Sequence, residues 1–99
     1  MIDHFIKRRH RIIEFENKRQ DIEKDLREAA ERRRMEVWFR LDKRDIWTIT
    51  LLGRRYKEKA QIKYNVVKGS WTIGKSPTVY HHGPDALKEW LKRKIRKVL

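Results

Sequence analysis

Cysteine is absent from the 99-residue chain. Disulfide bonds and thiolate metal sites are therefore excluded, and the absence is compatible with a reducing compartment. No apolar run approaches the roughly 20 residues that a membrane-spanning helix needs. The first four residues, Met1 to His4, do not begin a signal peptide. We therefore expect a cytoplasmic protein, or one that lies on a nucleoid.

Proline and glycine are scarce, and none occurs before Gly53. Good helix formers dominate up to Arg34, and apolar side chains recur along one side of a helix in a stripe about 120° wide. The stripe predicts one long amphipathic helix, with a break near Asn17 to Asp21 as the alternative. Its apolar members are Phe5, Ile12, Phe15, Ile22, Leu26 and Ala29.

Such a helix is too long for a small sheet. About 30 helical residues extend roughly 45 Å, whereas a strand of about seven residues extends roughly 23 Å. We expect residues 1–34 to be a projecting arm or a dimerisation element, so that a homodimer could form through this helix. Arg8, Arg19 and Arg33 interrupt the stripe and disfavour a long coiled coil. The basic residues 7–11 would lie at the free end.

Acidic residues become scarce after residue 31. Residues 1–31 carry eight basic and eight acidic side chains, whereas residues 32–99 carry nineteen basic and six acidic ones. The whole net charge of +13 therefore belongs to the second part of the chain. Such an asymmetry is typical of a surface that meets phosphates or an acidic partner, although many small basic proteins have no single reason for their charge.

Apolar residues alternate with polar ones through residues 35–73. This period of two predicts four antiparallel strands, each with one buried face. The apolar sets are Val37, Phe39 and Leu41; Trp47, Ile49 and Leu51; Ala60, Ile62, Tyr64 and Val66; and Trp71 and Ile73. Residues 42–45, 53–57 and 68–69 provide the turns, and residues 78–82 could add a fifth, edge strand.

A second helix is expected after Gly83-Pro84, because proline is favoured in a first helical turn. Leu87, Leu91, Ile95 and Val98 form its apolar side. The predicted fold is thus α+β, with residues 1–34 as the N-terminal helix. Residues 35–99 form a four- to five-stranded antiparallel meander followed by the C-terminal helix, in a single domain overall.

Signals for catalysis are weak. The adjacent His81 and His82 would point to opposite faces of a strand and could not share a metal ion. The carboxylates of the strand region lie mostly near turns, so no magnesium site is predicted. The sequence has no glycine-rich phosphate loop and no nucleophile motif. We therefore predict no catalytic residue, metal or cofactor, and a protein that is not an enzyme.

The polar face of the predicted sheet favours nucleic-acid binding, because Trp38 offers a stacking surface among basic residues. The strandedness is left open. The predicted binding residues are Trp38, Arg40, Arg44, Arg54, Arg55, Lys57, Lys59, Lys63, Lys92, Arg93, Arg96 and Lys97.

Two alternatives remain at this stage. The two helices could cover opposite faces of the sheet, in which case Trp38, Ile46 and Leu52 would be core residues. The partner could also be a protein with an acidic or phosphorylated surface, as for a phage-type inhibitor that covers the nucleic-acid groove of an enzyme.

Overall fold

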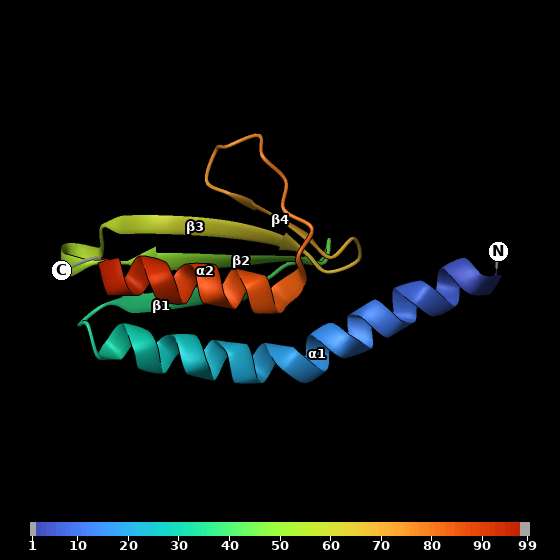
Figure 1. The fold of residues 1–99 in the computed structure, drawn as a ribbon, viewed down its shortest axis with the longest axis horizontal. Helices are drawn as coiled ribbons and strands as arrows, with labels where there is room; N and C mark the ends of the chain where they lie inside the picture. The colour runs from blue at the N-terminus through green and yellow to red at the C-terminus, as the bar shows by residue number, and fades with distance from the viewer. Residues whose placement is uncertain (1, 98–99) are drawn as a thin grey trace.

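In the computed structural model, the chain forms two helices and a four-stranded antiparallel sheet (Figure 1). The structure describes the backbone of residues 2–97 and the side chains of residues 12–97. The predicted α+β class and the meander order β1-β2-β3-β4 are confirmed. The elements are α1 (Ile2–Glu31), β1 (Glu36–Leu41), β2 (Ile46–Leu52), the 3₁₀ turn η1 (Arg54–Tyr56), β3 (Glu58–Asn65), β4 (Ser70–Ile73) and α2 (Gly83–Lys97).

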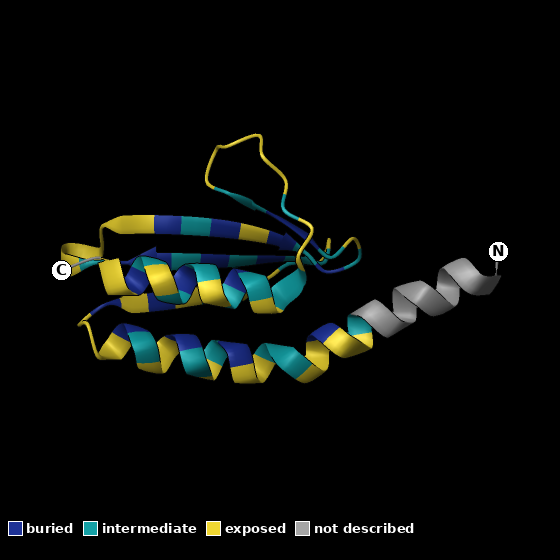
Figure 2. Ribbon diagram, viewed as in Figure 1, coloured by how far each residue is buried: buried dark blue, intermediate teal, exposed yellow. Residues whose placement is uncertain are grey.

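The strand register aligns the apolar residues into one continuous layer. Phe39 is opposite Ile49, which is opposite Ile62, and Ile62 is opposite Ile73. Because side chains alternate between the two faces, this row and its neighbours point to the same side. Buried segments therefore alternate with less buried ones along the strands (Figure 2).

Both helices lie on that same side of the sheet, packed next to each other (Figure 1). Trp47 is fully buried at the centre, within 5.1 to 6.2 Å (ring centroids) of Phe15 of α1, Phe39 of β1 and Tyr64 of β3. Among the residues whose side chains are described, helix α1 contributes four buried residues to this core, and α2 contributes three. These are Phe15, Ile22, Leu26 and Ala30 from α1, and Leu87, Leu91 and Ile95 from α2.

The interpretation with one helix on each face is wrong. The side chain of Trp38 is 56% exposed, and Ile46 is only partly buried. Leu52 is buried, yet it does not belong to the main core cluster. The described core residues of α1 and α2 pack into one and the same cluster, so neither helix covers the second face.

Helix α1 is a single helix, so the alternative of a break near residues 17–21 is wrong. It ends in a Schellman-type turn, in which the Met35 amide donates to the Ala30 carbonyl at 2.9 Å. Arg34 takes the left-handed position of this turn, with φ of 57°, where glycine is usual. The expectations for Phe5 and for the basic residues 7–11 fall outside the described side chains.

The predicted fifth strand is reduced to a single bridge. Tyr80 exchanges two backbone hydrogen bonds with Trp71, at 2.8 and 2.9 Å, and their rings stack at 4.5 Å. Helix α2 then begins at Gly83, whose φ of +78° turns the chain, and Pro84 follows in the first turn as expected.

We expect Leu26→Ala to lower the free energy of unfolding by about 2–5 kcal/mol, because a fully buried side chain would leave a cavity between α1 and the sheet. Ile13→Ala on the same helix is the matched control. Its side chain is 57% exposed, so we expect a change within about 0.5 kcal/mol. Urea denaturation measures both. Equal losses would contradict the observed orientation of α1.

Candidate functional site

The second face of the sheet carries polar and basic side chains in register. Trp38 of β1 is opposite Thr50 of β2, which is opposite Gln61 of β3. The next row holds Arg40, Thr48, Lys63 and Thr72, from all four strands. This face therefore offers an aromatic ring, hydroxyls, an amide and two cations on a rigid platform.

A groove of about 870 Å³ runs over this face, and we call it the sheet-face groove. Residues from the turns and from the segment after β4 form its rim. Its charged lining consists of four cations and one carboxylate, which belong to Arg40, Arg44, Lys63, Lys68 and Asp42. Its polar lining includes Thr48, Gln61, Asn65, Ser70 and Thr72.

The carboxylate in the described lining of the groove, that of Asp42, is hydrogen-bonded to the backbone of the β1–β2 turn. Asp42 Oδ1 accepts hydrogen bonds from the amides of Arg44 (2.8 Å) and Ile46 (3.1 Å), which fixes the turn between β1 and β2. The groove keeps a positive character because its four cations outnumber this carboxylate, and its lining includes groups that can hydrogen-bond to a ligand.

Two exposed aromatic rings lie together near one end of the open face. The Trp38 and Tyr56 ring centroids are 6.3 Å apart, with the rings tilted by 40°. The indole N–H of Trp38 donates to Glu36 Oε2 at 3.2 Å, which helps to hold its ring in place. Tyr56 is 66% exposed, so the aromatic pair is open to solvent.

A second hollow, of about 280 Å³, lies at this end of the molecule, and we call it the end pocket. The α1–β1 connection, the β2–β3 loop and the start of β3 meet there (Figure 1). No carboxylate belongs to its described lining, which comprises six cationic residues and two uncharged ones. They are Arg33, Arg34, Arg54, Arg55, Lys57, Lys59, Met35 and Gly53.

The loop that builds the end pocket has an unusual backbone. Arg55 and Tyr56 both have φ of 58°, in the left-handed region that costs an L-residue roughly 1–2 kcal/mol. The loop closes through the Gly53 amide, which donates to the Lys57 carbonyl at 2.8 Å. With Arg34, three non-glycine residues at this end adopt such a conformation. Strained residues of this type often lie at ligand sites.

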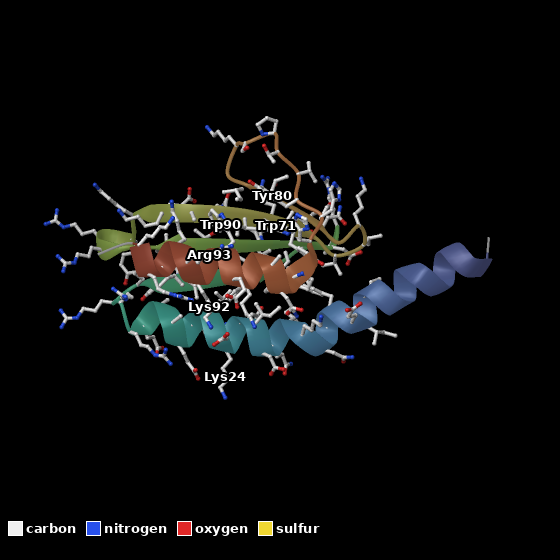
Figure 3. The ribbon with its side chains drawn as sticks, viewed as in Figure 1. Lys24, Trp71, Tyr80, Trp90, Lys92 and Arg93 are labelled. Carbon is white, nitrogen blue, oxygen red and sulfur yellow. The ribbon has the colours of Figure 1, made fainter. Side chains whose placement is uncertain are left out.

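A third basic group lies on α2. Arg93, Lys94 and Lys97 surround Trp90 in a hollow of about 350 Å³, and Arg96 is exposed on the same last turns. Figure 3 places Trp90 near Trp71 and Tyr80, beside β4, and the Trp90 and Trp71 ring centroids are 6.5 Å apart. Trp90 is therefore partly core and partly surface.

Lys92 is oriented differently from the other predicted binding residues of α2. Its Nζ lies 3.2 Å from Asp25 Oδ2 of α1, and Lys88 approaches the same carboxylate at 3.8 Å. These residues connect the two helices. Lys92, which the sequence predicts to bind nucleic acid, therefore lies between the two helices, whereas Arg93 and Arg96 are exposed.

The negative charges of the protein are concentrated where its ion pairs form. Among the side chains of residues 12–97, every ion pair has a member in α1, and none uses a cation of the sheet-face groove or the end pocket. Lys18 illustrates the pairing, since its hydrogen bond to Asp85 (3.0 Å) raises its pKa above 10.5, with a smaller effect from Glu14.

The structure divides the predicted binding residues among these places. Arg40, Arg44 and Lys63 line the sheet-face groove, and Trp38 stands beside it. Arg54, Arg55, Lys57 and Lys59 line the end pocket at the opposite end from Arg44. The sequence reasoning missed Arg33, Arg34, Tyr56 and Lys68, of which the exposed Tyr56 in a basic loop was the most visible signal.

Comparisons with protein-family models, with curated proteins and with solved structures find no significant match to this chain. Within the described residues, no helix has the length and apolarity needed to cross a membrane. In the same part of the chain, no three side chains of the metal-binding types gather at one place.

We expect Arg55→Gly to be more stable than Arg55→Ala by about 1 kcal/mol, because both remove the same charge but only glycine relieves the left-handed backbone. Thermal unfolding of the two variants and the parent measures this difference. Equal stability of the two variants would contradict a strained loop.

Proposed function

We propose that this protein binds nucleic acid, without catalysis, through the open face of its sheet, and that it does so in the cytoplasm. The observation that carries the proposal is the uncovered face itself. It bears Trp38, which is 56% exposed, next to a groove whose four cations have no ion-pair partner among the described side chains.

The side chains of this face match the base and the phosphate of a nucleotide. Aromatic rings stack on bases with little regard to sequence, and cations along a groove follow the phosphate backbone. The hydroxyl and amide groups between them can hydrogen-bond to base edges, which are accessible in an unpaired strand. A flat platform with an exposed ring therefore favours single strands over duplexes.

A partner protein with an acidic surface would be attracted by the same charges. Exposed aromatic rings also occur at protein interfaces, but Trp38 stands beside a groove lined by cations, hydroxyls and amides, a combination that matches the bases and phosphates of a nucleic-acid strand. We therefore favour nucleic acid. Recovery of a protein partner after nuclease treatment, with no oligonucleotide binding at low salt, would reverse this preference.

Affinity for a single-stranded oligonucleotide should fall steeply with salt, because binding releases the counterions of the neutralised phosphates. Six to ten phosphate contacts with a single strand would cost about 3 × 10²- to 2 × 10⁴-fold in affinity between 50 and 200 mM salt. Fluorescence anisotropy of a labelled oligonucleotide measures this. The double variant Arg40→Gln/Lys63→Gln should lower the slope of log K against log salt by about 1.4, since each phosphate contact with a single strand contributes about 0.7.

Lys24→Gln is the matched control for this measurement. Figure 3 shows Lys24 on α1, directed away from the sheet, so its loss should leave the salt slope unchanged. An affinity that does not depend on salt concentration, or no binding at 50 mM salt, would refute the proposal.

Trp38→Ala should weaken binding of a single strand by about 5- to 150-fold, the loss expected for one stacked base. The folded state should be largely unaffected, because the ring is mainly exposed. Ile13→Ala is the control, since Ile13 is a similarly exposed apolar residue on the helical layer. Equal affinities of the two variants would show that Trp38 makes no contact with the ligand.

A further inference from the structure

We propose that the end pocket binds the terminal phosphate monoester of a nucleic-acid strand, while the adjacent base stacks on Trp38 and Tyr56. This inference rests on the proposed function and names the part of the ligand that the protein recognises best. The sheet-face groove would hold the following nucleotides.

The charge of the end pocket exceeds the need of an internal phosphate. A phosphodiester carries one negative charge, whereas a terminal phosphate monoester carries about 1.5 to 2 at neutral pH. Six cations converge on the pocket, and its described lining offers no carboxylate to neutralise them. A group of higher negative charge than a diester is therefore the better match.

Arginine supplies four of these six cations. Its planar guanidinium can donate two parallel hydrogen bonds to phosphate oxygens, and a terminal phosphate presents three free oxygens. An internal phosphodiester presents only two, because two of its oxygens are esterified. The donors of this pocket therefore suit an end of the strand.

The aromatic pair lies at the correct place for the adjacent base. Tyr56 belongs to the same loop as Arg54 and Arg55, and its ring is 6.3 Å from that of Trp38. Trp38 is three residues from Met35 of the pocket lining, or about 10 Å along an extended strand. Arg40 lies about 7 Å further, at the groove.

The backbone supports a dedicated pocket. The left-handed residues Arg34, Arg55 and Tyr56 all lie at this end; the two arginines line the pocket, and the Tyr56 ring lies beside Trp38. Gly53 leaves room for the side chain of Lys59, another residue of the pocket. A Cβ atom there would meet Lys59 Cε at 2.7 Å, so the Lys59 side chain passes where any other residue would displace it.

The test compares three forms of one short single-stranded oligonucleotide, labelled internally: with a 5′-phosphate, with a 3′-phosphate and with hydroxyls at both ends. Fluorescence anisotropy at fixed salt should show binding at least about tenfold tighter for one phosphorylated form than for the hydroxyl form. The two phosphorylated forms identify which end enters the pocket.

The double variant Arg54→Gln/Arg55→Gln should abolish the preference for the phosphorylated end and retain binding of the hydroxyl form. Gly53→Ala, which displaces Lys59 without removing a charge, should reduce the preference. Lys24→Gln should leave it intact. Circular dichroism of each variant checks folding, and all of the altered arginines are exposed.

Equal affinity for the three forms would overturn this inference and leave the proposed function standing. Failure of every form to bind would overturn both. A preference that survives in the double variant would place the phosphate elsewhere and also overturn the inference, as would tighter binding of a phosphorylated peptide than of the phosphorylated oligonucleotide.

Discussion

The aromatic cluster around Trp47 is the interaction on which the rest of the structure depends. Phe15, Phe39 and Tyr64 approach this ring from α1, β1 and β3, so a single side chain connects the helical layer with three strands. Aromatic rings bury large areas and prefer edge-to-face or offset arrangements, which restricts how α1 can lie on the sheet. With α2 packed beside α1, both helices cover the same face of the sheet and leave the other face uncovered by either.

The order of the strands and the identity of the buried face follow from alternation, which is why the sheet could be predicted residue by residue. The side on which each helix packs could not, because an amphipathic helix shows only that one of its sides is buried. Residues such as Ile46 and Leu52 made a second apolar layer credible. The structure instead leaves Ile46 partly buried and buries Leu52 locally, outside the main core.

The candidate site was predictable where it lies on strands and much less so where it lies on loops. Trp38, Arg40 and Lys63 share a face because of the period of two alone. The end pocket joins residues about 20 positions apart, Arg33 and Arg34 with Arg54 and Arg55, and only the antiparallel return of β1 and β2 brings them together. The left-handed conformation of this loop could not be predicted from the sequence, because arginine and tyrosine occupy positions where glycine or asparagine is usual.

The concentration of acidic residues in α1 distributes the charge of the molecule unevenly. Residues 12–31 contain seven acidic and four basic side chains, a net charge of −3, whereas residues 32–97 contain six acidic and nineteen basic ones, a net charge of +13. Residues 1–31 as a whole carry no net charge, because their eight basic side chains balance their eight acidic ones, and α1 lies on the side of the sheet opposite the groove. In the field of a polyanion the protein would turn before contact, with the helix away from the phosphates and the open face toward them, so that a larger fraction of encounters would begin in a productive orientation.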